Sequence, residues 1–101
     1  MKKLAPEIAR KRLESVPRWR FSERRGAITR EFVFADFAQA FAFMANIALA
    51  AEKRDHHPDW SNAYNRVKIT WTTHDAGGLT DRDLELARYC DTAFARLAPV
   101  A

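Results

Sequence analysis

The three histidines of this 101-residue chain lie within nineteen consecutive positions, as His56, His57 and His74. Imidazole is the side chain whose ordinary pKa lies nearest to neutral pH, so it exchanges protons there without a large pKa shift. Two carboxylates accompany the first pair: Glu52 lies one helical turn before His56, and Asp55 directly precedes it. Such neighbours orient an imidazole or raise its pKa. This grouping favours general acid–base chemistry, which needs only titratable groups in a shaped pocket.

Two other interpretations of the histidines compete with acid–base catalysis. A zinc site needs three or four ligands directed at one point, and the adjacent His56 and His57 rarely share one. The single cysteine, Cys90, falls on the predicted buried face of a helix and so does not complete such a site. A structural role, in which histidines cap helix ends and satisfy turns, fits one histidine better than three in one window. The sequence therefore favours catalysis without a metal, and it contains no phosphate-binding glycine loop.

The segment from residue 36 to residue 54 leads into the first two histidines. Asp36 is a good N-cap and Gln39 follows at the capping-box spacing, so a helix is predicted from this point. A surface helix needs one apolar stripe, but this segment, uncharged over residues 37–51, carries nearly two. We expect one stripe to pack on the protein's own sheet and the other on a second subunit, although a helix wholly buried in one domain is the alternative. The two stripes are Phe37, Phe41, Met44, Ala48 and Ala51, and beside them Ala40, Phe43, Ile47 and Ala50.

The other elements precede and follow this helix in a regular order. A short helix is predicted over residues 6–15, and a last helix is expected to begin at Thr80, with Asp83 at its third position and Pro99 beyond its end. The order α-β-β-α-β-β-α indicates an α+β fold, in which residues 1–101 form a single domain with a four-stranded antiparallel sheet and helices on one face. The predicted strands cover residues 18–22, 27–34, 60–64 and 67–73, with Asn65-Arg66 as the second hairpin loop.

This order also predicts where the histidines meet. His56 and His57 precede the third strand, whereas His74 follows the fourth. If these strands pair antiparallel, the end of the fourth returns beside the start of the third. We therefore expect the three imidazoles to converge on loops at one end of the sheet, where functional residues concentrate.

Composition and charge exclude several classes of protein. With 48% hydrophobic and 30% charged residues, the chain has the composition of an ordinary globular domain. A lone cysteine forms no internal disulfide, so a reducing compartment, the cytoplasm, is expected, and no stretch is apolar enough to span a membrane. Residues 1–30 hold ten Lys or Arg and three Glu, a net of +7, and the rest carries −3 of the total of +4. The basic first third is either a solvated face or a surface for an acidic partner, whereas nucleic-acid binding would need a continuous basic stripe and is not expected.

Four short motifs surround and connect the histidines, at residues 52–60 (EKRDHHPDW), 64–69 (YNRVKI), 73–74 (TH) and 78–83 (GLTDRD). Together with the aromatic run at residues 34–44, they resemble the pterin-4a-carbinolamine dehydratase family over about residues 27–97. Residues 1–25 match only loosely, which leaves the basic segment unexplained. The resemblance implies a four-stranded antiparallel sheet with three helices, and a homodimer or homotetramer held by helix 36–54.

The resemblance further implies a reaction. A 4a-hydroxytetrahydropterin, formed when aromatic amino acid hydroxylases turn over, loses water to give quinonoid dihydropterin, and neither a metal nor an organic cofactor takes part. By similarity the three histidines are catalytic, with His56 and His74 in acid–base work on the leaving hydroxyl and His57 in positioning the substrate. The implied substrate-binding residues are Asp55, Pro58, Trp60, Thr73, Asp75 and Ala76, and the implied supporting residues are Glu52, Arg82 and Asp83.

The alternative to an enzyme also comes from the resemblance. Some members of the family act as a dimerisation cofactor of a transcription factor or in the assembly of a carbon-fixing enzyme. A protein with only such a role would be expected to lose the histidines of the pocket, and this chain keeps all three. The sequence therefore favours the dehydratase over a non-enzymatic interaction protein.

Overall fold

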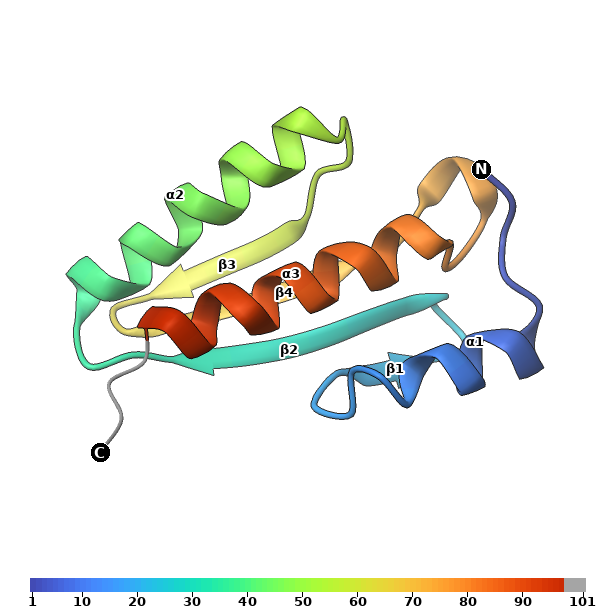
Figure 1. Cartoon of the computed structure of the whole chain (residues 1–101), viewed down its shortest axis with the longest axis horizontal. Helices are drawn as coiled ribbons and strands as arrows, with labels where there is room; N and C mark the ends of the chain where they lie inside the picture. Colours follow the sequence, from blue (N-terminus) through green and yellow to red (C-terminus); the bar gives the residue numbers. More distant parts are fainter. Residues whose placement is uncertain (98–101) are drawn as a thin grey trace.

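The computed structural model describes residues 1–97, which form three α-helices, four β-strands and one short 3₁₀ helix (Figure 1). The predicted order α-β-β-α-β-β-α is confirmed, and the 3₁₀ helix is inserted between the last strand and the last helix. Pro99 lies outside the described residues. The elements are α1 (Pro6–Leu13), β1 (Arg20–Ser22), β2 (Ala27–Val33), α2 (Phe37–Lys53), β3 (Asp59–Ala63), β4 (Arg66–Trp71), η1 (His74–Ala76) and α3 (Asp81–Leu97).

The sheet is antiparallel throughout and has the strand order β1-β2-β4-β3. In β4 large apolar side chains recur at every second residue, and in β2 the matching positions are Ile28, Arg30 and Phe32, so these side chains point to one face of the sheet. That face is fully buried at Ile28, Phe32, Val67, Ile69 and Trp71. The alternate positions of the same strands carry mostly polar or charged side chains, and no helix within residues 1–97 covers that other face (Figure 1).

The helices cover the buried face, where α2 and α3 lie alongside each other over the sheet (Figure 1). Their shared core is aromatic: Phe43 of α2 lies 4.8 Å from Phe32 of β2 between ring centroids, and Phe94 of α3 lies 5.2 Å from the same ring. Tilted and edge-on pairs of this kind contribute beyond the area they bury. One continuous core of this kind joins both helices to the two central strands.

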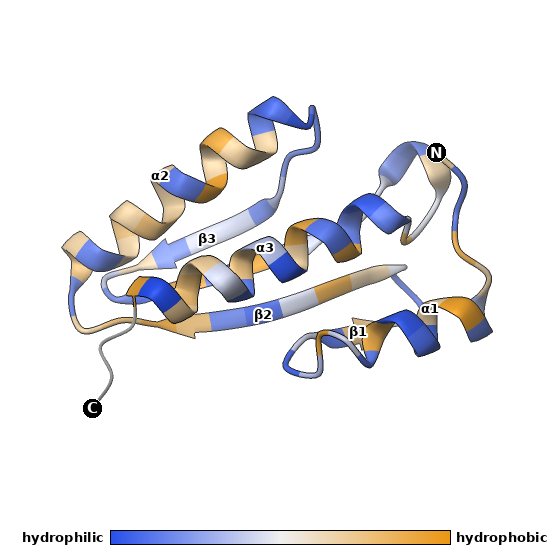
Figure 2. Cartoon of the chain, in the orientation of Figure 1, coloured by the Kyte–Doolittle hydropathy of each residue, from blue (hydrophilic) through white to orange (hydrophobic). Residues whose placement is uncertain are grey.

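Helix α2 begins where the sequence predicts it. The carboxylate of Asp36 accepts a hydrogen bond of 2.9 Å from the backbone N–H of Gln39, whose own side chain accepts from the N–H of Ala35. The helix buries the stripe of Ala40, Phe43 and Ile47 and leaves much of the other stripe exposed, although most of its ribbon has apolar colours in Figure 2. The open residues include Phe37 at 47% exposure, Phe41 at 59% and the neighbouring Leu49 at 74%, whereas Ala51 is buried.

Two predicted boundaries at the second hairpin are wrong. The turn consists of Tyr64 and Asn65 instead of Asn65 and Arg66, because Tyr64 takes the positive φ of +53° and Arg66 pairs as the first residue of β4. The Asn65 side chain is used elsewhere, since its amide donates to the carbonyl of Phe34 at 2.8 Å. Strand β4 also ends at Trp71, two residues early, because Thr73 leaves the ladder to form a bridge with Gly78.

Candidate active site

The three histidines line one hollow at the end of the sheet, as their positions in the sequence predict. The hollow has a volume of about 250 Å³ and lies where α2 ends and β4 gives way to η1. Its lining residues are Asp55, His56, His57, Thr72, Thr73, His74 and Asp75.

The end of α2 turns the chain so that His56 faces the hollow. Asp55 adopts the left-handed conformation at φ +51°, the N–H of His56 donates to the carbonyl of Ala51 at 3.0 Å, and the N–H of Asp55 donates to that of Glu52 at 3.1 Å. These two bonds form a Schellman motif, in which Asp55 stands where glycine is usual. Aspartate is one of the few residues that tolerates this conformation. The left-handed turn ends the helix and leaves His57 exposed.

The other side of the hollow is a tight loop between β4 and α3. The N–H of Thr73 donates to the carbonyl of Gly78 at 3.1 Å, and the carbonyl of Thr73 accepts from Ala76 and Gly77, also at 3.1 Å. The β1–β2 turn supports this loop from outside, because the Thr72 hydroxyl donates to the carbonyl of Gly26 at 2.7 Å. Gly26, at φ +60°, approaches so closely that a β-carbon there would lie 2.7 Å from the Gly78 Cα. The loop that carries His74 is therefore fixed at both ends.

One half of the site, which we call the buried wall, consists of His56, Trp71, Thr73, Thr80 and Asp83. Asp83 is completely buried, and its Oδ1 lies 2.6 Å from Nε2 of His56. Its Oδ2 accepts from the Thr73 hydroxyl at 2.7 Å and from the Thr80 backbone N–H at 2.9 Å. The ring of Trp71 lies nearly parallel to the His56 ring, with centroids 5.9 Å apart. The imidazole is thus held by a hydrogen bond at one edge and by an indole on one face.

The other half, which we call the exposed rim, consists of His57, His74, Glu52 and Asp59. His57 Nε2 lies 2.8 Å from a Glu52 carboxylate oxygen, and the two side chains are 57% and 79% exposed. His74 Nε2 lies 3.8 Å from an Asp59 oxygen, and its side chain is 81% exposed, against 10% for His56. Contacts between side chains this exposed contribute little to stability, so the rim histidines can exchange them for a ligand.

The remaining predicted site residues divide between the hollow and its surroundings. Asp55, Thr73 and Asp75 line the hollow, and Asp83 supports it from the wall. Trp60 is half-buried against the core, on the inner face of β3. Pro58 and Ala76 are half-buried beside the lining residues without being among them.

Arg82 has a role between the helices. Its guanidinium donates to the carbonyl of Arg54, and the Arg54 Nε donates to Glu85 at 2.7 Å. The hydrogen bond from Arg54 lowers the pKa of the Glu85 carboxyl below its ordinary value. Arg82 therefore ties the end of α2 to α3 and so keeps His56 next to Asp83.

Sequence reasoning missed three residues of the site. Thr72 lines the hollow, Trp71 backs His56, and the Thr80 hydroxyl pairs with that of Thr73 at 2.9 Å. Thr80 is therefore not a simple N-cap: it is Asp83 that accepts from the Thr80 N–H, the reciprocal half of a capping box. The one sequence feature that could have indicated these contacts is the capping-box spacing of Thr80 and Asp83. A capping box uses one carboxylate oxygen of Asp83 and leaves the second oxygen for another donor.

Neither a nucleophilic cysteine nor a grouped metal site accompanies the histidines in residues 1–97. Burial raises the pKa of the Cys90 thiol to about 12, so this thiol stays protonated at neutral pH. Within the same residues, no three His, Cys, Asp or Glu side chains are placed to hold one metal ion. None of the helices in that range is both long and apolar enough to cross a membrane.

Comparison with known proteins places this arrangement in a family. The family model described as "Pterin 4 alpha carbinolamine dehydratase" matches residues 2–93. The chain belongs to this family. A relative from Rhodopseudomonas palustris, named for pterin-4-alpha-carbinolamine dehydratase, is 50% identical over 98% of both chains. A relative of the same name from Burkholderia cenocepacia is 52% identical over 98% of this chain and 97% of its own. The match extends through nearly all of the first 25 residues, which on sequence motifs alone resemble the family only loosely.

Solved structures agree with the family. A protein from Brucella melitensis, described as a transcriptional coactivator/pterin dehydratase, superposes with a TM-score of 0.87 at 44% identity, over 91% of this chain and 98% of its own. A pterin dehydratase-like protein, described as a RuBisCO assembly factor in the alpha-carboxysome, superposes with a TM-score of 0.67 at 23% identity, over 75% of this chain and 88% of its own. The second likeness extends to the fold alone.

Proposed function

We propose that this protein is a hydro-lyase that removes water from a 4a-hydroxytetrahydropterin to give quinonoid dihydropterin. The observation that carries the proposal is the hollow in which His56, His57 and His74 meet, in a chain of the pterin-4a-carbinolamine dehydratase family. The bond from C4a to the hydroxyl breaks, the hydroxyl leaves as water after receiving a proton, and a second proton leaves a ring nitrogen. No electrons are exchanged with a partner, so the chemistry calls for no redox cofactor.

His56 is suited to one of these proton transfers because its orientation is fixed. An ionised Asp83 only accepts hydrogen bonds, so its 2.6 Å contact places a proton on Nε2 of His56. The other ring nitrogen, Nδ1, is then the atom that exchanges a proton with the substrate. A carboxylate that holds an imidazole in one tautomer is a recurrent device of acid–base sites.

His74 is suited to the second transfer from the exposed rim. It belongs to η1, on the side of the hollow opposite the end of α2, and its side chain is 81% exposed. We assign His57 to substrate positioning, because its Nε2 is already paired with Glu52. Asp55, Thr73 and Asp75 complete the lining, and Pro58, Trp60 and Ala76 shape the chain behind it. In this assignment Glu52, Arg82 and Asp83 act through the histidines that they orient.

A dehydratase assay with synthetic 4a-hydroxytetrahydropterin tests the proposal. Replacing His56 or His74 by alanine is expected to lower the enzymatic rate by about 10² to 10⁴-fold each, the usual size of an acid–base contribution. Lys11→Ala, which removes an exposed basic side chain of α1 that does not line the hollow, is the control and should leave the rate unchanged. If the double histidine variant dehydrated the pterin as fast as the wild type, the catalytic assignment would be wrong.

We also propose that the open stripe of α2 is an interface between copies of the chain, in a homodimer or homotetramer. Phe37 and Phe41 pack with centroids 6.0 Å apart and remain about half exposed on a single chain. Exposed aromatic pairs of this size are typical of protein interfaces. Phe41→Glu is expected to give monomers in light scattering, whereas Lys53→Glu on the same helix is not. A wild-type monomer at micromolar concentration would contradict the interface.

A non-enzymatic role as a dimerisation, assembly or transcriptional cofactor is the second candidate function. The Brucella melitensis protein is described both as a coactivator and as a dehydratase, so one fold is associated with both roles. The intact set of three histidines favours the enzyme. The same assay separates the two candidates, because an interaction protein without catalysis would not accelerate dehydration. In this proposal the protein acts in the cytoplasm, where it recycles the pterin cofactor of an aromatic amino acid hydroxylase.

A further inference from the structure

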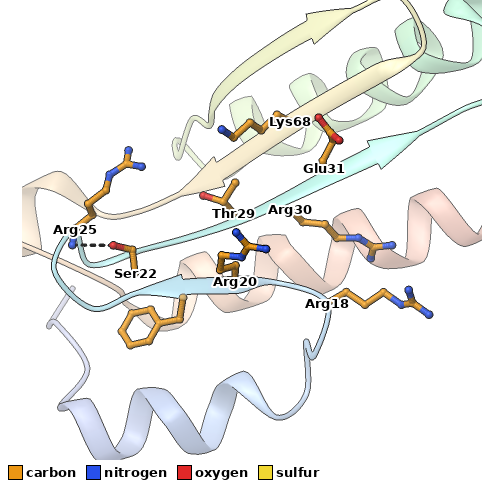
Figure 3. A pocket seen from close by; sticks show the side chains of 9 residues that line it. Arg18, Arg20, Ser22, Arg25, Thr29, Arg30, Glu31 and Lys68 are labelled. Carbon is orange, nitrogen blue, oxygen red and sulfur yellow. Dashed lines mark hydrogen bonds between the residues drawn. The ribbon is translucent and has the colours of Figure 1, made fainter.

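The helix-free face of the sheet holds a second, larger hollow that the proposed reaction does not use. It is an open groove of about 630 Å³ over β1, β2 and β4, and it shares no lining residue with the histidine site (Figure 3). Helices α2 and α3 lie on the other side of the sheet (Figure 1). The residues that line the groove are Arg18, Arg20, Phe21, Ser22, Arg25, Thr29, Arg30, Glu31 and Lys68.

The charge of this groove is strongly positive after its ion pairs are counted. Arg30 is compensated by Asp91 at 2.6 Å, and Glu31 is compensated by Arg66 at 3.1 Å. Figure 3 shows Arg20, Arg25 and Lys68 arranged around Thr29. Uncompensated cations around one groove repel one another and favour an anionic ligand. The exposed cations of the groove that form no side-chain ion pair within residues 1–97 are Arg18, Arg20, Arg25 and Lys68.

Six of the ten Lys and Arg residues in positions 1–30 fall into two populations, whereas Lys2, Lys3, Lys11 and Arg24 neither line the groove nor form a side-chain ion pair within residues 1–97. One population pairs with carboxylates: Arg10 with Glu23, Arg12 with Asp81 and Arg30 with Asp91. The other population, Arg18, Arg20 and Arg25, lines the groove without such pairs, and Lys68 of β4 joins it from a distant segment of the chain. A merely solvated face would not require these cations to gather around one groove.

We propose that this groove binds an extended, carboxylate-rich segment of a partner protein. A guanidinium presents two parallel N–H donors that match the two oxygens of a carboxylate, and the groove offers three guanidinium groups outside ion pairs. The Thr29 and Ser22 hydroxyls add neutral hydrogen-bonding groups between the cations. The groove is open and polar, whereas a site for a small organic molecule is mostly apolar and enclosed.

The same face is poorly suited to nucleic acid. Sheets that bind single strands stack the bases on exposed aromatic side chains. The only aromatic residue that lines this groove is Phe21, which is half-buried and packs against the core. The outward positions of β2 and β4 within the groove are Thr29, Glu31 and Lys68, none of which offers a stacking surface.

The test compares two double variants of the full chain that lose the same charge. Arg20→Gln/Arg25→Gln removes two cations from the groove, whereas Lys11→Gln/Arg24→Gln removes two exposed cations that do not line it. Fluorescence anisotropy measures binding of a labelled Glu-Ser repeat peptide, with a Gln-Ser peptide and single-stranded DNA as competitors. The groove variant is expected to weaken peptide binding at least about tenfold and the control less than about twofold, with binding that weakens as salt rises.

Several outcomes would overturn the proposal. Equal losses in both double variants would mean that net charge alone attracts the peptide. If the wild type did not bind the peptide at low salt, the groove would not be a site for acidic segments. If DNA bound more strongly than the peptide and the groove variant lost that binding, the groove would be a nucleic-acid site instead. Lys68→Gln, on a different strand, gives an independent variant should the double change disturb β1. Dehydratase activity is expected to be unchanged in all these variants, so this test is separate from the proposed reaction.

Discussion

The two halves of the histidine site differ in burial and in how fully their polar groups are paired within the protein. In the buried wall, the His56 side chain is 10% exposed and both carboxylate oxygens of Asp83 have partners in the protein. In the exposed rim, His57 and His74 are 57% and 81% exposed and lie beside carboxylates that are themselves mostly in solvent. The wall is therefore part of the core, whereas the side chains of the rim lie on the surface.

This difference in burial indicates which site residues contribute to both stability and activity and which contribute to activity alone. A buried, fully paired carboxylate cannot lose a partner without a large free-energy cost, because the remaining polar groups stay buried. An exposed ion pair exchanges its partner for water at little cost. Substitutions in the wall should therefore change both folding and catalysis, and those in the rim should change catalysis alone.

The most severe test of the comparison is Asp83→Ala. The change leaves the Thr80 N–H, the Thr73 hydroxyl and the His56 imidazole without their acceptor, and it is expected to lower the free energy of unfolding by about 3–5 kcal/mol. Urea denaturation followed by circular dichroism measures this loss. Asp81→Ala, in the same turn of α3 but exposed, is the control and should cost less than about 1 kcal/mol. Equal losses at the two positions would show that the wall is not a core element.

Gly26→Ala tests whether the loop between β4 and α3, which joins the wall to the rim, depends on support from outside the site. The new β-carbon would meet the Gly78 Cα at 2.7 Å and would also sit at φ +60°, so we expect a loss of about 2–4 kcal/mol in unfolding free energy. Gly77→Ala is the matched control, because its φ is +80° but nothing lies within 4 Å of the added carbon. That variant should lose only about 1 kcal/mol from backbone strain. Similar losses in urea denaturation of both variants would mean that the close approach of Gly26 is unimportant.

His56→Ala and His74→Ala compare one histidine of the wall with one histidine of the rim directly. Both are expected to slow dehydration, but His56→Ala should also destabilise the protein by about 1–3 kcal/mol because it leaves Asp83 with an unpaired oxygen. His74→Ala should change the free energy of unfolding by less than about 0.5 kcal/mol, as a surface substitution does. Thermal unfolding of the two variants side by side gives the answer. A destabilisation that is larger for His74→Ala would reverse the assignment of wall and rim.

The smallest expected effect concerns the pH dependence of an exposed pair. The pKa of Glu85 is lowered in the folded protein, chiefly by the hydrogen bond from Arg54, so its contribution is present above the ordinary carboxyl pKa and is lost as the pH falls through the folded value. Glu85→Gln should therefore destabilise the protein at pH 7, by no more than about 1 kcal/mol because the side chain is 48% exposed. In acid the variant and the wild type should unfold alike in urea. A difference that persists there would mean that the glutamine disturbs packing instead of charge.

Much of this architecture is predictable because it depends on local patterns. The alternation in β2 and β4, the cap at Asp36 and the order of elements are properties of neighbouring residues. The convergence of the histidines follows from antiparallel pairing alone, since that rule brings the end of β4 back to the start of β3. These features do not need knowledge of which residues touch across the core.

The rest depends on contacts between distant segments. Nothing near Trp71 indicates that its indole backs His56, fifteen residues earlier, and nothing near Thr80 indicates that its hydroxyl meets Thr73 instead of capping α3. The positive φ of Tyr64 is decided by register across the hairpin, which overrides the preference of Asn65 for that conformation. The groove on the helix-free face likewise requires the sheet order, because β1 and β4 contribute to it without being paired with each other.

The parallel rings of His56 and Trp71 give the protein an optical signal of its own. Indole emission depends on the charge and polarity of whatever lies against the ring, and here that neighbour is the imidazole assigned to proton transfer. Trp71 is completely buried, so dissolved quenchers reach it less readily than they reach the half-buried Trp60. Trp19 is also buried, at 5% exposure, but it does not lie against a histidine ring, so a change in the ionisation of His56, or arrival of a ligand beside it, should alter chiefly the fluorescence of Trp71.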